Sequence, residues 1–284
     1  MATTSVNGVT IHYEHRHAPI GADAAVPPRG ETVALLNGVM ASTSSWEYYA
    51  GFLTGGGYDV LMHDFRGQLL SEKPEGPYTF AQHREDFLQL CRALEIGACH
   101  LVGTSYGGET AMRIAVDSPE MVKSLVIIDS VSELDALATR FVQSWIDLAA
   151  TGDTSLFYAS VLPSLYSRSF LRDQSAMIDG RAERMKELPP DYLRGQIELY
   201  RAFLSDVTMT PELGKIQAPA LVVCGAEDIL KPVRFSEIIA REIPTSELVI
   251  IPDCGHVAVF EQPETLATLI LGFLQRHGFL QRRG

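Results

Sequence analysis

One serine in this chain has surroundings that suit nucleophilic chemistry. Ser105 lies in the segment GTSYG (residues 103–107), directly after the apolar run CHLVGT and before a segment with helical periodicity. A sharp turn from a strand into a helix strains the residue at its centre, and glycines on both sides leave room for the backbone to approach closely. Free N–H groups at the start of the helix face whatever is bound to Ser105. We therefore predict that Ser105 is a nucleophile.

A serine hydroxyl needs a base, and His256 is the predicted base. It lies in the segment IPDCGHVAVFEQPE, just after the last predicted strand. The other histidines lie in predicted strands, helices or terminal segments: His12, His15, His17, His63, His83, His100 and His277. We expect those of the N-terminal hairpin to be exposed. His15 and His17 share a strand face without a further metal ligand nearby, which favours a solvated edge.

A carboxylate must hold the imidazole in one tautomer and stabilise its charged form. Asp228, in the segment VVCGAEDILKP, follows the predicted strand that precedes the one leading to His256. We favour Asp228 because the order strand, acid loop, helix, strand, base loop places it near the histidine. Asp129, at the end of the strand after the Ser105 helix, and Glu227 are the alternatives.

Attack on a carbonyl creates an oxyanion, which two backbone N–H donors commonly stabilise. The first predicted donor is the N–H of Tyr106, at the start of the helix. The second is expected in the loop NGVMASTSSW, where Gly38 permits a tight turn. We choose the Val39 N–H, with Met40 as the second candidate. We also expect Met40 and Trp145 to contact the substrate.

The elements that must position these residues alternate along the chain. Short apolar runs alternate with segments of helical periodicity, which predicts an α/β fold with a mostly parallel sheet flanked by helices. The runs TVALLNG, YDVLMHD, CHLVGT, KSLVIID, ALVVCG and LVIIP lack polar alternation, which indicates strands covered on both faces. The segment VNGVTIHYEH is predicted to form a hairpin that turns at Asn7-Gly8. Helices are expected at residues 44–53, 80–94, 107–117, 233–242 and 264–276.

The alternation stops between residues 132 and 212, where only helical periodicity is visible and large aromatic residues are frequent. We predict a core made of residues 1–131 and 213–284, with residues 132–212 as an inserted helical layer. Most aromatic side chains of this layer are expected to pack it together. Others are expected to line a cavity between the layer and the sheet.

Composition excludes several classes of function. A net charge of -12 disfavours nucleic-acid and anionic-membrane surfaces, which need clustered positive charge. No signal sequence and no membrane-spanning run are visible, so we expect a cytoplasmic protein. The four cysteines lack metal-site spacing and are expected to be buried, reduced thiols. No metal motif or phosphate-binding loop is present, so we expect a small-molecule partner and no cofactor; the sequence leaves the oligomeric state open.

The elbow around Ser105, followed in order by Asp228 and His256, resembles the α/β-hydrolase superfamily over nearly the whole chain. HDFRGQLLSEKP is similar to that family's D-x-R-G-x-G-x-S segment, and the 132–212 insertion looks like its cap domain. The resemblance implies a serine hydrolase acting on an ester or lactone, and the aromatic-rich insertion favours an apolar acyl part. A serine in the elbow, and not an aspartate, disfavours the dehalogenase and epoxide hydrolase members.

Two positions depart from the family pattern. Asn37 stands where the family usually has histidine, and LLNGVMASTSSW is similar to the bacterial synthase that joins two 3-hydroxyacyl chains in rhamnolipid production. That similarity implies acyl transfer to an alcohol or hydroxyacyl acceptor as an alternative to hydrolysis. Leu69 replaces an expected glycine, so the loop GQLLS is expected to differ in shape. The resemblance is also compatible with carbon–carbon bond cleavage, with cofactor-free oxidation, and with a ligand receptor that hydrolyses slowly.

Overall fold

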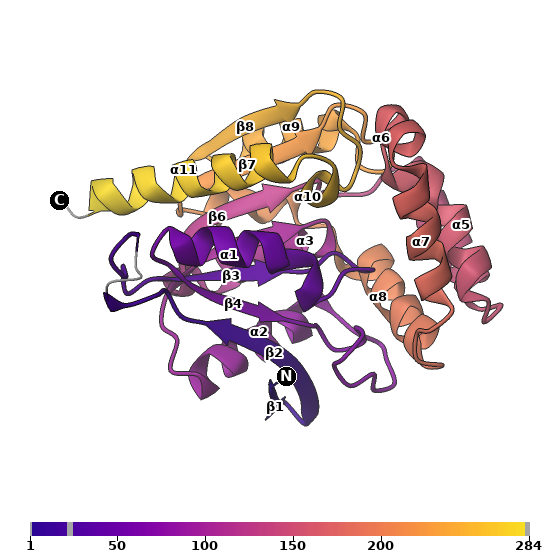
Figure 1. The fold of residues 1–284 in the computed structure, drawn as a ribbon, viewed down its shortest axis with the longest axis horizontal. Coiled ribbons are helices and arrows are strands. Elements are labelled where there is room, and N and C mark those ends of the chain that lie inside the picture. The colour runs from indigo at the N-terminus through magenta and orange to yellow at the C-terminus, as the bar shows by residue number, and fades with distance from the viewer. Residues whose placement is uncertain (1, 22–24, 282–284) are drawn as a thin grey trace.

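The computed structural model describes residues 2–21 and 25–281 and has an eight-stranded sheet at its centre (Figure 1). The strand order is β1-β2-β4-β3-β5-β6-β7-β8. Strand β2 of the N-terminal hairpin pairs antiparallel with β4. The other strands, β3 to β8, all run parallel to one another. The bounds are β1 Ala2–Val6, β2 Val9–Arg16, β3 Thr32–Leu36, β4 Asp59–His63, β5 Cys99–Thr104, β6 Val122–Ile128, β7 Ala220–Gly225 and β8 Ser246–Ile251. The predicted α/β fold with a mostly parallel sheet is confirmed.

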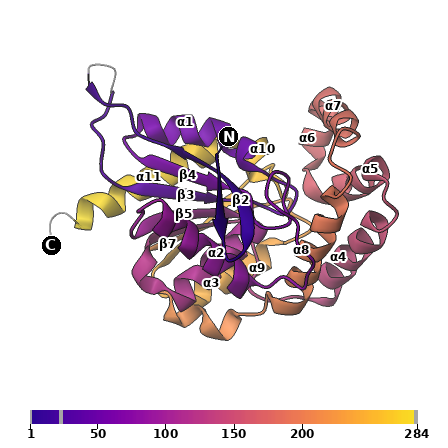
Figure 2. The ribbon, with the colours of Figure 1, turned by 90° about the horizontal axis from the view of Figure 1, so that it is seen from below.

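Apolar residues fill both sets of alternating positions in the central strands, so both faces of the sheet need a covering layer. In β3, Val33 and Leu35 belong to one buried cluster, and Ala34 and Leu36 belong to the other. Figure 2 shows helices on both faces of the sheet. One face carries α1 (Glu47–Gly55), α10 (Ala258–Glu261) and α11 (Pro263–Gln281), and the other carries α2 (Phe80–Ala93), α3 (Tyr106–Asp117) and α9 (Val233–Glu242).

The edge strand β8 contradicts the prediction that every apolar run would be covered on both faces. Ile250 is 43% exposed, and of the β8 residues, all described in the structure, only Ile251 is buried. The reason is position, since β8 pairs with β7 alone. An apolar run does not show whether its strand lies at the centre or at the edge of the sheet.

Five α-helices follow β6 and precede β7, with no strand among residues 132–212, all of which the structure describes. They are α4 (Ala136–Ala149), α5 (Thr154–Leu165), α6 (Arg168–Asp173), α7 (Ser175–Met185) and α8 (Tyr192–Asp206). Asp135, Asp153 and Ser167 cap the first three, because each side chain accepts a hydrogen bond from a backbone N–H in the first helical turn. In Figure 1 this helical layer stands to one side of the sheet, and we keep that name for residues 132–212.

The N-terminal hairpin turns at Asn7 and Gly8 as predicted, but two expectations about its histidines are wrong. His12 is 1% exposed, and its Nε2 lies 3.3 Å from Thr43 Oγ1. A third possible metal ligand does lie beside His15 and His17: Asp59 Oδ2 is 3.0 Å from His17 Nδ1. The pairing of β2 with β4 creates this proximity, which sequence spacing does not reveal.

The four cysteines are buried free thiols, as the sequence predicted: Cys91, Cys99, Cys224 and Cys254. Among the helices that the structure describes, none combines the length and the apolar character needed to cross a membrane.

Candidate active site

Ser105 occupies the turn between β5 and α3 with φ 53° and ψ -121°, a conformation that residues with a side chain rarely adopt. The flanking glycines are required by close contacts of the backbone. A Cβ atom at Gly103 would overlap the carbonyl of Gly107, and one at Gly107 would overlap the carbonyl of Leu36 in β3. The glycines therefore let α3 approach β5 and β3 closely enough to present Ser105 at the end of the sheet.

The structure brings together the three residues predicted to act on a carbonyl. Ser105 Oγ lies 3.1 Å from His256 Nε2, and His256 Nδ1 lies 2.7 Å from Asp228 Oδ2. The other carboxylate oxygen of Asp228 accepts hydrogen bonds from the backbone N–H groups of Leu230 and Lys231, at 2.9 and 2.8 Å. Asp228 and His256 are 3% and 4% exposed. This geometry suits transfer of the Oγ proton to an imidazole that a fixed carboxylate orients.

The two alternative carboxylates have other partners. Asp129 accepts hydrogen bonds from the backbone N–H groups of Gly225 (3.0 Å) and Ala258 (3.1 Å), so it joins the loop of the acid to the loop of the base. Burial, with the nearby Asp228 as the second cause, raises the pKa of Asp129 well above its ordinary value. Glu227 accepts a hydrogen bond from the backbone N–H of Arg168 in the helical layer.

The two residues predicted to form an oxyanion hole, Val39 and Tyr106, line the same cavity as Ser105. Tyr106 is the first residue of α3, where the backbone N–H has no acceptor within the helix. The loop of Val39 passes the elbow so closely that a Cβ on Gly38 would lie 3.5 Å from Ser105 Cβ. Gln68 fastens this loop, because its Nε2 donates to the carbonyls of Gly38 (2.7 Å) and Val39 (3.1 Å).

The departures at Asn37 and Leu69 lie close together, and Asn37 is part of a buried hydrogen-bond network. Asn37 Nδ2 lies 3.1 Å from both Gln68 Oε1 and Asp64 Oδ1, and its Oδ1 accepts a hydrogen bond of 2.8 Å from Trp46 Nε1. Asn37 thus positions Gln68, which in turn holds the loop of Val39. Leu69 packs partly buried against the core beside this network. Sequence reasoning missed Gln68. Its position next to Leu69, in the segment GQLLS that departs from the family pattern, could have indicated it.

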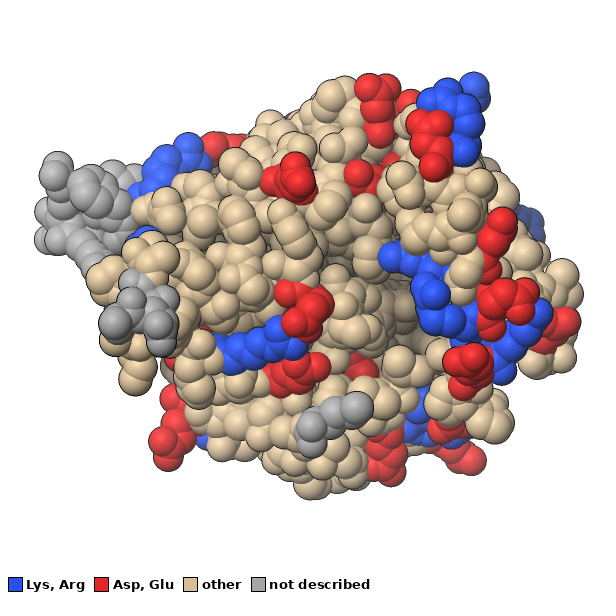
Figure 3. Space-filling model, in the orientation of Figure 1, with Lys and Arg blue, Asp and Glu red and all other residues tan. Residues whose placement is uncertain are grey.

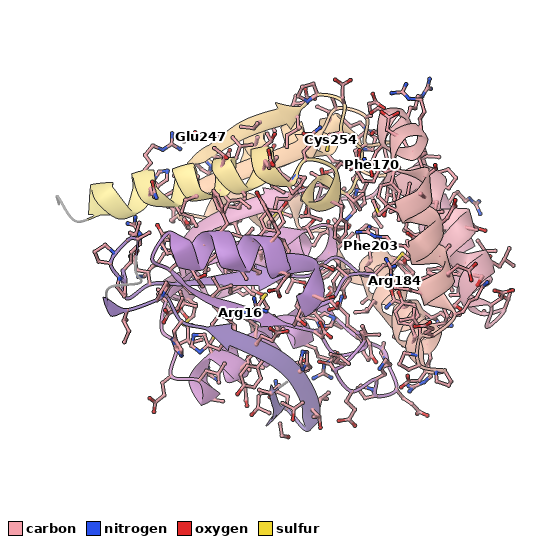
Figure 4. All side chains as sticks on the ribbon, in the orientation of Figure 1. Arg16, Phe170, Arg184, Phe203, Glu247 and Cys254 are labelled. Carbon is pink, nitrogen blue, oxygen red and sulfur yellow. The ribbon has the colours of Figure 1, made fainter. Side chains whose placement is uncertain are left out.

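A cavity of about 440 Å³ opens beside Ser105 and His256, between the sheet and the helical layer. Met40 and Trp145, the predicted substrate contacts, both line it. Its further lining is largely apolar or aromatic and includes Val142, Tyr158, Leu188, Tyr200 and Phe203. In Figure 3 a hollow lies beside the helical layer with Lys and Arg atoms at its rim, and Figure 4 places Phe203 and Arg184 in this region.

Three cations line the cavity, and of the described residues around it none is an aspartate or glutamate. Arg181 and Arg184 come from α7, and Lys231 comes from the loop of Asp228. Sequence reasoning missed Lys231, whose Nζ lies 3.0 Å from Ser105 Oγ and 2.7 Å from Glu109 Oε1. Lys231 is three residues from Asp228 in the sequence, but no local pattern shows that it reaches Ser105, 126 residues away.

Comparison with known proteins agrees with this architecture. Residues 31–263 match the family model of the alpha/beta hydrolase fold. The chain is 25% identical over 268 residues to a putative carbamate hydrolase of Serratia proteamaculans, covering 93% of this chain and 97% of the relative. It is 29% identical over 254 residues to a putative non-heme bromoperoxidase of Mycobacterium tuberculosis, covering 86% and 94%.

A solved structure extends the similarity to three dimensions. An α/β-hydrolase enzyme from a Medee basin deep-sea metagenome library matches with a TM-score of 0.88 at 26% identity, covering 96% of this chain and 97% of that one. The family model spans most of the chain, including the elbow, the helical layer and the loops of Asp228 and His256. The chain therefore belongs to the alpha/beta hydrolase fold family.

Proposed function

We propose that the protein is a serine hydrolase that cleaves a carboxylic ester or lactone with an apolar acyl part through an acyl-enzyme on Ser105. The observation that carries the proposal is the continuous set of contacts Ser105–His256–Asp228 at the wall of a largely apolar cavity. Membership of the alpha/beta hydrolase fold family supports it. Fold alone does not determine chemistry, so the proposed reaction class rests on the geometry of the site.

In the first half of the reaction, Ser105 Oγ attacks the carbonyl carbon and its proton passes to His256 Nε2. Asp228 holds the Nδ1–H of the imidazole and stabilises the imidazolium that forms. The N–H groups of Val39 and Tyr106 donate to the oxyanion, and one such donor contributes about 3–4 kcal/mol. His256 then gives its proton to the leaving alcohol. In the second half, His256 takes a proton from water, which attacks the acyl carbon and releases the acid.

The helical layer acts in this proposal as a cap that selects the acyl group. Trp145 and Met40 lie on the cavity wall, so an apolar acyl chain there removes apolar surface from water. We expect apolar acyl groups to be preferred over charged ones. Better turnover of dicarboxylate esters would contradict this expectation.

The experiment is a screen of p-nitrophenyl esters and lactones of graded acyl size, with a p-nitrophenyl carbamate included because one relative is named a putative carbamate hydrolase. Ser105→Ala should abolish turnover while the thermal midpoint stays near that of the wild type. Ser164→Ala, at a buried serine of α5 whose hydroxyl donates to the carbonyl of Val161, is the matched control. Undiminished turnover by Ser105→Ala would refute the proposal.

Acyl transfer is the second candidate, which the similarity of LLNGVMASTSSW to a 3-hydroxyacyl-joining synthase favours. The same acyl-enzyme would then be attacked by an alcohol in place of water. Adding primary alcohols or 3-hydroxyacyl esters to the assay separates the two reactions. Ester product at millimolar acceptor would identify transfer, and free acid alone would identify hydrolysis.

A further inference from the structure

A buried ion pair contacts the oxygen of the proposed nucleophile. Lys231 Nζ lies 3.0 Å from Ser105 Oγ and 2.7 Å from Glu109 Oε1, and its side chain is 5% exposed. Glu109 belongs to α3, the helix that directly follows Ser105, and is 0% exposed. The reaction described above uses neither residue.

The protons of this cluster can be assigned from its donors and acceptors. A lysine ammonium has three N–H groups and accepts no hydrogen bond. One N–H donates to Glu109 and one to Ser105 Oγ, and the ammonium lies 4.8 Å from the centre of the Phe203 ring. Because Lys231 only donates, Ser105 Oγ accepts from it and keeps its own proton for His256 Nε2. The serine oxygen therefore lies between a cationic donor and a base.

Stability does not explain the pair. Removing two charges from water costs several kcal/mol per ion, and well-packed apolar residues of the same volume often stabilise a protein as much or more. Burial raises the pKa of Glu109, while Lys231 and the Val131 N–H act in the opposite direction. Its second oxygen, Oε2, has no hydrogen-bond partner among the described residues. Buried charged side chains whose desolvation is unfavourable, such as Lys231 and Glu109, are typical of functional sites when they lie beside a reacting atom.

We propose that Lys231 is a further catalytic residue, which donates a hydrogen bond to Ser105 Oγ while the bond between Oγ and the acyl carbon forms and breaks, with Glu109 as its positioning residue. During acylation Oγ bonds to the carbon as its proton moves to His256. During deacylation the Oγ–carbon bond breaks, its electron pair stays on Oγ, and His256 returns the proton. The Oγ of an intact hydroxyl or of an acyl ester is a weak acceptor. Oγ becomes a stronger acceptor while its proton leaves during attack and while it departs from the acyl carbon, so the hydrogen bond from Lys231 strengthens in both transition states.

The inference rests on Ser105 being the nucleophile, so its test measures the reactivity of that serine without an assumed substrate. The readout is the second-order rate of labelling by an alkyl fluorophosphonate, with the labelled residue identified by mass spectrometry. Lys231→Met should label about 10- to 100-fold more slowly, the range expected for losing one hydrogen bond from a charged donor. Lys73→Met is the matched control, since Lys73 is also a buried lysine but bonds to the carbonyls of Leu69 and Ser71.

A second variant keeps the test decisive if Lys231→Met does not fold. The double substitution Glu109→Leu with Lys231→Met removes both charges, so no buried carboxylate is left alone. It should remain folded and label as slowly as the single variant. Labelling of a folded double variant at the wild-type rate would overturn the role of Lys231. A wild-type protein that is not labelled at Ser105 would instead overturn the serine nucleophile, and the role of Lys231 with it.

The positioning role of Glu109 has its own test. Glu109→Gln keeps an oxygen that can accept from Lys231 and should label within a few-fold of the wild-type rate. Glu109→Leu has no acceptor and should label as slowly as Lys231→Met. Equal labelling rates for the two Glu109 variants would show that Glu109 does not position the lysine.

Discussion

The backbone N–H of His256 donates a hydrogen bond of 2.9 Å to the carbonyl of Leu165, so the loop that carries the imidazole is fastened to the helical layer. The two segments touch again at the residue before His256, since a Cβ at Gly255 would clash with the backbone N of Ser167. Glu261 joins them, because its Oε1 accepts hydrogen bonds from the backbone N–H groups of Gly255 (3.1 Å) and Ser167 (3.2 Å). The position of the proposed base therefore depends on the helical layer as well as on the sheet.

Glu261→Ala should lower both turnover and stability, because it leaves the Gly255 and Ser167 N–H groups without their acceptor. The expected loss of stability is about 1–3 kcal/mol, and kcat should fall by about tenfold as the imidazole loses its fixed orientation. Thermal midpoint and kcat on the best ester are the measurements. Glu237→Ala, at an exposed position of α9, is the control and should change neither. An unchanged kcat in Glu261→Ala would show that this link does not orient His256.

The two buried aspartates at the ends of β6 and β7 should respond differently to the same substitution. Asp228→Asn should lower kcat by roughly 10³- to 10⁴-fold with little loss of stability, because an amide favours the wrong imidazole tautomer. Asp129→Asn should act mainly on stability, since its amide N–H₂ would face one of the two backbone N–H groups that the carboxylate now accepts from. Chemical denaturation and steady-state kinetics on both variants separate the effects. The reverse assignment would make Asp129 the partner of the base.

The fold was predictable because local patterns determine it. Runs such as ALVVCG have the two-sided apolar character of buried parallel strands, and the helices between them follow from the 3.6-residue period. The elbow was predictable for a related reason: Gly103 and Gly107 mark places where the backbone must approach without side chains. Asp228 and His256 could be located because the carboxyl ends of parallel strands meet at one edge of the sheet.

What the sequence could not predict depends on contacts between distant segments. Lys231 reaches Glu109 only because the loop after β7 folds over the start of α3, and nothing local to either residue shows it. The same holds for Asp59 beside His17, which is set by strand pairing. His12 was expected at the surface because the hairpin is terminal, yet packing against Thr43 buries it.

Trp145→Leu should move the preference for acyl size toward larger groups. Trp145 lines the cavity and lies against the Tyr200 ring, with 5.6 Å between ring centres, so a smaller side chain enlarges the space for the acyl part. We expect kcat/KM to fall for short acyl chains and to rise for the longest that the wild type accepts, with some loss of stability from the cavity created. Phe141→Leu is the control, because Phe141 packs near Trp145 but does not line the cavity. An unchanged order of acyl preference in Trp145→Leu would place the acyl part elsewhere.

Two buried histidines should make the protein sensitive to acid. Burial lowers the pKa of His83 to about 3, with Arg66 and His63 as further causes, and lowers the pKa of His63 to about 4. Above pH 6.5 both side chains are neutral in the folded and unfolded states, so neither adds a pH dependence. Between pH 6.5 and the lowered values, only the unfolded state binds these protons. The free energy of unfolding therefore decreases as the pH is lowered through this range, by up to about 1.4 kcal/mol per pH unit for each histidine.

His83→Phe should reduce this sensitivity without disturbing the surrounding rings. His83 packs against Phe65, Phe80 and Tyr106, and neither of its ring nitrogens has a hydrogen-bond partner among the described residues. The advantage of the variant over the wild type should therefore grow by about 2–3 kcal/mol between pH 7 and pH 4.5. Urea denaturation at both pH values measures it. If the free energy of unfolding of His83→Phe and of the wild type changed equally with pH, His83 would not be protonated differently in the folded and unfolded states, and the prediction would be wrong.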